Sequence, residues 1–288
     1  MKRDNMQIGL LGRDWDTGLG YQNAAIAKFL GVSKWLVPYR YWYRRKRRIA
    51  APRRRICVSR RDGRARIKKL LAGLDWLLFA EQPEIPRVVQ MAKDRGVAVA
   101  CVPNWEFLDP RSQWIHWVDL MICPTRITYR MINDWKTRYR LSFASIEVPW
   151  PIDLGRHPFR IRDHCHSVLY INGWGGGRAR RLDGTETHYR RKRLDLVIAA
   201  AALVPEIQFL VSSQTSLGGR VPPNVQRLPR QANNRSLYDS GDVCIQPSSW
   251  EGIGLPLLEC QAAGLPLVTT DAPPMNEYNP MATFPVIG

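Results

Sequence analysis

Two glutamates eight positions apart, Glu251 and Glu259, lie in a stretch where short apolar runs alternate with glycine and proline. The stretch predicts a strand over 242–246, a glycine turn and a short helix, because Pro256 suits a first helical turn and Gly264 suits the position after a helix end. Glycine lets the backbone approach a ligand closely, and the free N–H groups at a helix start face an anion. We therefore expect both carboxylates to face one ligand crevice at the ends of parallel strands.

Basic residues follow another predicted strand, Ser167–Gly173, in a glycine- and arginine-rich turn. Arg178, Arg180 and Arg181 lie in this turn, and Lys192 precedes an apolar run that predicts a helix. Cations at a helix N-terminus oppose the helix dipole unless an anion is bound there. The pattern favours a phosphate site, and it leaves open which of the three arginines meets the phosphate.

The residues from 251 to 268 resemble a known family. Glu-Gly-Ile-Gly-Leu-Pro-Leu-Leu-Glu, followed by Ala-x-Gly-x-Pro-x-Val, looks like the E-x7-E motif of retaining glycosyltransferases of family four. The resemblance covers nearly the whole chain and is specific mainly from 167 to 277. It implies the GT-B fold, an α/β architecture of two Rossmann-like, doubly wound domains that face a cleft. We expect an N-terminal acceptor-binding domain over 1–155 and a C-terminal nucleotide-sugar-binding domain over 156–288, the latter compact or truncated relative to the family.

This resemblance also implies a reaction. A sugar would move from a nucleotide sugar, linked to UDP or GDP, to an acceptor, with retention at the anomeric carbon. No metal and no cofactor besides this co-substrate would be needed, because cations neutralise the diphosphate while Glu251 contacts the sugar and Glu259 holds the ribose. Many relatives carry a His after the strand that ends at Val102, whereas this chain offers Glu106 for sugar or acceptor contact.

The residues expected to act fall into two groups by this resemblance. The catalytic residues are Glu251, Lys192, Arg178 and Glu106. The donor-binding residues are Gly18, Gly20, Gly173, Arg181, Arg227, Gly252, Ile253, Gly254, Leu255 and Glu259.

Positive charge is concentrated in one segment. The 288-residue chain has a formal net charge of +18, and fifteen of its 43 Lys and Arg residues lie between Arg40 and Lys69, against one acid, Asp62. Charge of this density favours an anionic partner. Aromatic residues at 41–43 adjoin the arginines, which suits stacking on a nucleic acid and equally an anionic membrane surface. The expected polyanion-binding residues are Arg44, Arg45, Lys46, Arg47, Arg48, Arg53, Arg54 and Arg55.

The acceptor stays open between hydroxymethylated DNA and a phosphorylated lipid or glycan. The charge also fits a different class of function, a non-catalytic nucleic-acid-binding protein derived from a glycosyltransferase fold.

The composition argues against a membrane-spanning protein and a metal-binding protein, and it indicates a cellular compartment. No apolar run reaches the ~20 residues of a membrane-spanning helix, and His164 and His166 lack the further ligands of a metal site. The six cysteines form no CxxC and the start lacks a signal-peptide cleavage pattern. We therefore expect reduced thiols and a cytoplasmic protein, with DNA association, a peripheral membrane position or, for a viral protein, the host cytoplasm as variants.

Overall fold

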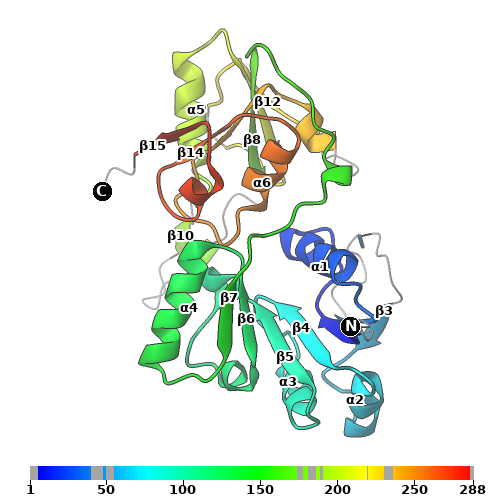
Figure 1. Cartoon of the computed structure of the whole chain (residues 1–288). Helices are drawn as coiled ribbons and strands as arrows, with labels where there is room; N and C mark the ends of the chain where they lie inside the picture. The colour runs from blue at the N-terminus through cyan, green and yellow to red at the C-terminus, as the bar shows by residue number, and fades with distance from the viewer. Residues whose placement is uncertain are drawn as a thin grey trace. The chain divides into compact units, whose positions relative to one another are not determined.

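The computed structural model describes residues 6–39, 48–49, 55–173, 178–180, 186–188, 191–218, 220–229 and 236–285. The chain divides into two compact units, Met1–Pro151 and Ile152–Gly288 (Figure 1). The division falls after Pro151, close to the boundary expected after residue 155.

The first unit is built on a parallel seven-stranded sheet with the order β3-β2-β1-β4-β5-β6-β7. Its strands are β1 (Ile8–Leu11), β2 (Lys34–Pro38), β3 (Arg55–Val58), β4 (Trp76–Ala80), β5 (Ala98–Val102), β6 (Leu120–Cys123) and β7 (Ala144–Glu147). The connecting helices are α1 (Gly18–Phe29), α2 (Arg64–Leu71), α3 (Pro86–Lys93) and α4 (Arg126–Arg138).

Both faces of this sheet are covered by helices. Leu10 and Leu11 are neighbours on β1 and enter different core clusters, because successive side chains of a strand point to opposite faces. Ala27 of α1 belongs to one cluster, and Ile67 of α2 and Val88 of α3 belong to the other. Continuous apolar strands of this kind are typical of parallel sheets buried on both sides.

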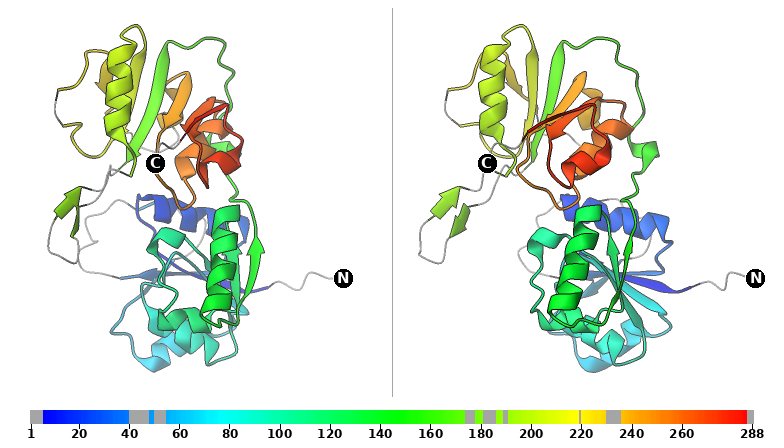
Figure 2. Two further views of the ribbon diagram at one scale, coloured as in Figure 1. Left: turned by 90° about the vertical axis from the view of Figure 1, so that its left-hand side faces the viewer. Right: turned by 60° about the vertical axis from the view of Figure 1, so that its left-hand side comes forward.

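The second unit repeats the plan with a parallel six-stranded sheet in the order β12-β11-β8-β13-β14-β15. Its strands are β8 (Ser167–Gly173), β11 (Gln208–Ser213), β12 (Val225–Arg227), β13 (Val243–Gln246), β14 (Leu267–Thr270) and β15 (Ala282–Phe284), and an antiparallel pair, β9 (Arg178–Arg180) and β10 (Glu186–His188), stands apart. Helix α5 (Leu194–Leu203) packs on one face and α6 (Leu255–Ala262) on the other (Figure 2).

The strand order decides where ligands bind in each unit. In the first sheet the chain runs outward from β1 to β3 and then resumes on the other side at β4, so the order reverses between β1 and β4. In the second sheet the same reversal lies between β8 and β13. Open parallel sheets bind ligands outside the carboxyl ends of the two strands that flank such a switch point. Each unit is therefore a doubly wound α/β domain with one predicted ligand position, as the sequence indicated.

Candidate functional site

The strand, turn and helix predicted around Glu251 and Glu259 are confirmed. β13 ends at Gln246 and α6 begins at Leu255. Gly254 caps α6 with φ of +72°, and a Cβ on it would lie 2.4 Å from Leu257 Cδ1, so this position requires glycine. Gly264 ends the helix with φ of +80°, and a Cβ on it would lie 2.4 Å from the carbonyl oxygen of Arg160.

Glu251 is buried at the switch point between β8 and β13, with 4% of its surface exposed. Lys192 is also buried and forms an ion pair with Glu251 Oε1. Arg191 Nη2 lies 3.8 Å from Glu251 Oε2. Burial alone would raise the pKa of Glu251, but the charges of Lys192 and Arg191 and the hydrogen bond from Lys192 outweigh it and lower the pKa. Glu251 is therefore ionised, and two cations share its single negative charge.

The backbone at Lys192 is fixed by β8 and by the turn that follows β13. Tyr170 of β8 donates from its hydroxyl to the Lys192 carbonyl oxygen at 2.7 Å, and the Ser249 N–H donates to the Arg191 carbonyl oxygen at 2.8 Å. The Arg191 guanidinium lies 4.8 Å from the ring centre of Trp250. Arg191 was not among the expected site residues, although its place directly before Lys192 was a usable signal.

The dipole argument for a phosphate at the start of α5 is weaker than the sequence indicated. Lys192 is paired with Glu251, and the Arg193 guanidinium lies 3.2 Å from the carboxylate of Asp195. Both cations therefore have a carboxylate partner. Arg191 and Lys192 both lie beside Glu251, at the position where a sheet of this topology is expected to bind a ligand.

Glu259 is held by residues that sequence reasoning missed. Tyr238 donates a hydrogen bond from its hydroxyl to Glu259 Oε2, and His157 Nε2 lies 3.8 Å from Oε1. The His157 ring packs edge-on against Tyr238, with ring centres 5.3 Å apart. Burial and the nearby Glu259 carboxylate raise the pKa of Tyr238 well above its ordinary value, so its hydroxyl stays protonated and donates.

The other expected donor-binding residues of the second unit differ in surroundings. Gly173 ends β8 with φ of +57°, and Ile253 accepts a hydrogen bond from the Tyr278 hydroxyl through its carbonyl oxygen. Gly252 is buried and Leu255 is half-buried. Arg227 ends the edge strand β12, separated from β13 by β11 and β8, and donates to the Ser213 carbonyl oxygen. Arg181 and the side chains of Arg178 and Arg180 lie outside the described residues.

In the first unit, Gly18 and Gly20 lie in the first turn of α1. A Cβ on Gly20 would lie 1.8 Å from the Trp15 carbonyl oxygen, whereas nothing lies within 4 Å of one on Gly18. Packing alone therefore explains glycine at position 20. Glu106 is half-buried in a 3₁₀ helix, Trp105–Phe107, beyond the end of β5.

Of the expected polyanion-binding residues, Arg48 and Arg55 lie within the described part of the chain. Both face Asp14, which is fully buried, with guanidinium-to-carboxylate distances of 3.8 and 3.2 Å. Arg55 therefore balances an internal charge. The remaining six, Arg44, Arg45, Lys46, Arg47, Arg53 and Arg54, lie outside the described residues.

A second basic surface lies further along the same segment. Helix α2 buries Ile67 and Leu71 and exposes the opposite side. We call the exposed basic side chains of this helix and the loop before it the α2 basic surface: Arg60, Arg61, Arg64, Arg66, Lys68 and Lys69.

The described ranges contain no helix that is long and apolar enough to cross a membrane, and no group of three or more metal-ligating side chains. All six cysteines are free thiols.

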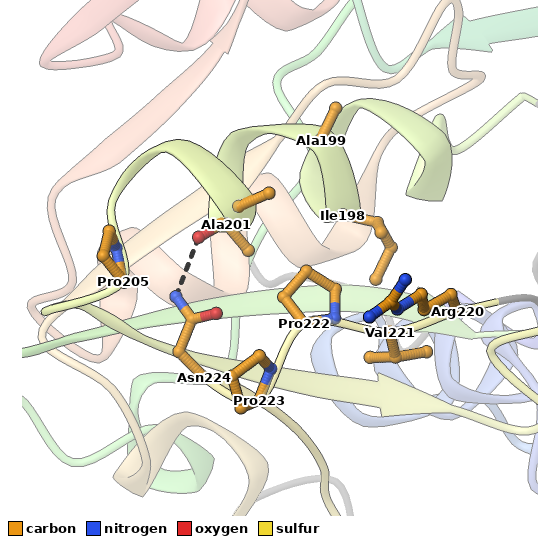
Figure 3. Close-up of a pocket in the computed structure, with 10 residues that line it drawn as sticks. Ile198, Ala199, Ala201, Pro205, Arg220, Val221, Pro222, Pro223 and Asn224 are labelled. Atoms are coloured by element: carbon orange, nitrogen blue, oxygen red, sulfur yellow. Dashed lines mark hydrogen bonds between the residues drawn. The ribbon is translucent and has the colours of Figure 1, made fainter.

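An apolar pocket of about 450 Å³ lies between the C-terminal half of α5 and the loop before β12 (Figure 3). Ile198 and Pro222 help to line it, and Asn224 donates to the Ala201 carbonyl oxygen at its border. The loop before β12 enters the sheet at the amino end of its strands, so this pocket is on the opposite edge from Glu251.

Comparison with known proteins supports the sequence resemblance. Residues 184–281 match the sequence family described as "Glycosyl transferases group 1", a segment that includes Lys192, Tyr238, Glu251 and Glu259. No curated protein sequence matches the chain.

Solved structures of glycosyltransferases share the fold. HepE of Anabaena, in complex with UDP, has a TM-score of 0.64 at 12% identity, with 94% of this chain and 82% of HepE covered. An alpha-glucosyltransferase in complex with UDP and a 13-mer DNA containing a HMU base has a TM-score of 0.61 at 10% identity, with 92% and 80% covered. The pneumococcal O-GlcNAc transferase GtfA, in complex with UDP and GlcNAc, has a TM-score of 0.56 at 19% identity and 78% coverage of this chain, which spans about half (48%) of that enzyme. The chain thus has the GT-B fold, as the sequence predicted.

Proposed function

We propose that the chain is a retaining, metal-independent glycosyltransferase of family four. It transfers a sugar from a nucleotide diphosphate sugar to an anionic acceptor. The observation that carries this proposal is the buried cluster of Lys192, Arg191 and Glu251 at the β8/β13 switch point, inside the segment that matches glycosyl transferases group 1. UDP is the nucleotide bound in the three similar structures, which favours a UDP-linked donor.

The cluster suits the departure of a diphosphate. As the bond between the anomeric carbon and the phosphate oxygen breaks, negative charge grows on the phosphate. The acceptor hydroxyl oxygen forms the new bond to the anomeric carbon, and its proton passes to the departing diphosphate. Lys192, Arg191 and the backbone N–H groups at the start of α6 would stabilise that charge. These fixed positive groups are the proposed substitute for a metal ion.

The two carboxylates would hold the donor at its hydroxyl groups. Ionised Glu251 accepts hydrogen bonds from sugar hydroxyls, and Glu259, oriented by Tyr238, accepts them from the ribose. Because Glu251 is already ionised, binding the donor requires an exchange of ion-pair partners, in which Lys192 turns from the carboxylate to the phosphate.

The acceptor class rests on charge. The α2 basic surface carries six exposed cations in the acceptor-side unit and supports an anionic acceptor. Hydroxymethylated DNA is one candidate, supported by the similar alpha-glucosyltransferase bound to DNA, and a phosphorylated lipid or glycan is the other.

The deciding experiment measures nucleotide release from UDP- and GDP-sugars with each acceptor class. We expect Glu251→Gln and Glu259→Gln to lower release strongly, Glu206→Gln on the exposed surface to leave it unchanged, and excess EDTA to have no effect. Proton NMR of the product reports retention at the anomeric carbon. If both variants release nucleotide at the wild-type rate, the assignment of Glu251 and Glu259 to the site is wrong.

A non-catalytic nucleic-acid-binding protein is the second candidate, and the α2 basic surface is what favours it. Such a protein would bind a DNA duplex and a nucleotide sugar without releasing nucleotide from any donor. Turnover with any acceptor excludes it.

A further inference from the structure

The switch point of the first sheet carries polar side chains of its own. Arg13 follows β1, Glu81 follows β4 directly, and Asn104 follows β5. These are the carboxyl ends of the three central strands, so the residues gather at the position where this sheet binds a ligand. Glu81 was not among the residues expected from the sequence.

Glu81 has an unusual backbone conformation, with φ of +67°. A residue with a Cβ seldom adopts this region unless its surroundings hold it there, and such residues concentrate at functional sites. Here its N–H donates to the Val102 carbonyl oxygen at 2.9 Å, and its own carbonyl oxygen accepts from the Cys101 thiol at 3.5 Å. The neighbouring strand β5 thus fixes the direction in which the Glu81 side chain leaves the sheet.

The Glu81 carboxyl is half-buried and forms a hydrogen bond with Asn104. Asn104 is in turn locked by Gln22 of α1, through reciprocal amide hydrogen bonds of 3.0 and 3.3 Å. A buried, paired amide of this kind holds its partner in one orientation. The Glu81 carboxyl is therefore preorganised before any ligand binds.

The surrounding charges do not neutralise Glu81. Arg13 is the nearby cation, and its guanidinium Nε donates to Glu84 Oε1 at 2.8 Å. Burial raises the pKa of Glu81, as does the Glu84 carboxylate, and Arg13 and Asn104 only partly offset this. Glu81 therefore holds a proton, or a donated hydrogen bond, more tightly than an ordinary glutamate.

We propose that Glu81 binds the acceptor: its carboxylate accepts a hydrogen bond from a hydroxyl group of the acceptor molecule at the β1/β4 switch point. This inference rests on the proposed glycosyl transfer and names the chemistry of its acceptor side. An anion is disfavoured beside Glu81 and Glu84, so the part of the acceptor that enters here is a neutral, hydroxyl-bearing group. Anionic parts of the same molecule would contact basic residues elsewhere.

The test compares transfer with donor hydrolysis in full-length Glu81→Gln, which keeps the side-chain shape and the bond to Asn104. Acceptors are a hydroxymethylated DNA duplex and a polyprenyl phosphate sugar, and water alone serves as the third. We expect kcat/KM for the consumed acceptor to fall about tenfold or more. The donor KM and the rate of transfer to water should stay within about twofold, because the donor is held by the other unit. Glu206→Gln is the matched control.

The pH profile separates binding from a merely structural role. In the wild type, kcat/KM for the acceptor should rise as Glu81 ionises, above the ordinary pKa of a glutamate, and this limb should vanish in Glu81→Gln. The groups facing Glu81 that could contribute are Arg13, Glu84 and the Cys101 thiol. Burial raises the pKa of the Cys101 thiol, which stays protonated over this range, and the variant Glu84→Gln tests the contribution of the second acid.

The possible outcomes distinguish a failure of the Glu81 inference from a failure of the proposed function. Unchanged acceptor kinetics in a folded Glu81→Gln, with wild-type turnover intact, overturns this inference and leaves the proposed function standing. Equal losses of transfer and of hydrolysis also overturn it, since a disturbed fold or donor site would produce them. If the wild type releases nucleotide neither with an acceptor nor with water, the proposed function fails and this inference falls with it.

Discussion

The two sheets share a topology, yet different charged side chains lie at their switch points. Between β8 and β13, Arg191 and Lys192 face the single carboxylate of Glu251. Between β1 and β4, Glu81 and Glu84 face the single guanidinium of Arg13. Under the proposed function, the same strand order would serve a diphosphate at one position and hydroxyl groups at the other. The chemistry of each site comes from loop residues that the scaffold places, and not from the fold itself.

The largest effect is expected from Lys192→Met. This change leaves Glu251 buried without its nearest cation, and breaking a buried pair costs about 3–5 kcal/mol. Loss of a cation beside the leaving phosphate should also lower kcat by about 10²–10³. Urea unfolding and nucleotide release measure the two effects. The double variant Lys192→Met/Glu251→Gln should regain stability and not activity; a return of activity would contradict the assigned role.

Removing the buried carboxylate of Asp14 in the first unit should destabilise the protein less than Lys192→Met does. Asp14→Ala removes the carboxylate that Arg55 and Arg48 share, but those arginines keep 21% and 49% of their side-chain surface exposed. We expect a smaller loss of stability, about 2 kcal/mol, because water can solvate the remaining cations. Urea unfolding measures it, with exposed Asp94→Asn as control. A loss of stability as large as that of Lys192→Met would contradict the view that solvent exposure of the remaining cations reduces the cost.

Tyr238→Phe tests how the donor side is organised. The substitution keeps the ring against His157 and removes one hydrogen bond to Glu259, so the donor KM should rise about tenfold while kcat changes little. Steady-state kinetics at saturating acceptor measure it. In a Glu259→Gln background the substitution should have no further effect. Additive losses would mean that Tyr238 acts on something other than Glu259.

Glu251 and Glu81 should make the free energy of unfolding depend on pH in opposite directions. The lowered pKa of Glu251 stabilises the fold above the ordinary value of 4.5, and this contribution is lost as the pH falls through the lowered pKa. The raised pKa of Glu81 contributes stability below 4.5 that is lost as the pH rises through the raised pKa. Urea unfolding across acidic pH should therefore show Glu251→Gln and Glu81→Gln removing opposite slopes. If both substitutions change the pH dependence of stability in the same direction, one of the two pKa directions is wrong.

The smallest effect on folding is expected at the α2 basic surface. Arg64→Glu/Lys68→Glu should change stability by less than about 0.5 kcal/mol, since both side chains are exposed. If the acceptor is DNA, the slope of log Kd against log salt should become shallower by about 0.9 for each phosphate that the variant no longer neutralises. Arg95→Glu/Arg130→Glu reverses as many charges elsewhere on the first unit and should leave the slope unchanged.

Much of the architecture is local in origin and was predictable. Apolar runs such as Trp76–Ala80 mark buried strands without reference to the rest of the chain, and Gly254 and Gly264 occupy positions whose φ angles disfavour other residues. The edge strands β7 and β15 were missed, because their residues are largely exposed and lack an apolar run.

The amino-acid sequence alone determined the strand–turn–helix around Glu251 and the concentration of positive charge between Arg40 and Lys69, since each depends on residues close together in the chain. The two α/β units were expected from the resemblance to a known family. Only the tertiary structure decided which charges meet. Lys192 reaches Glu251 across 59 positions and Arg13 reaches Glu84 across 71. Such partners are set by the order of strands in a sheet, and that order follows from the packing of whole helices on both faces.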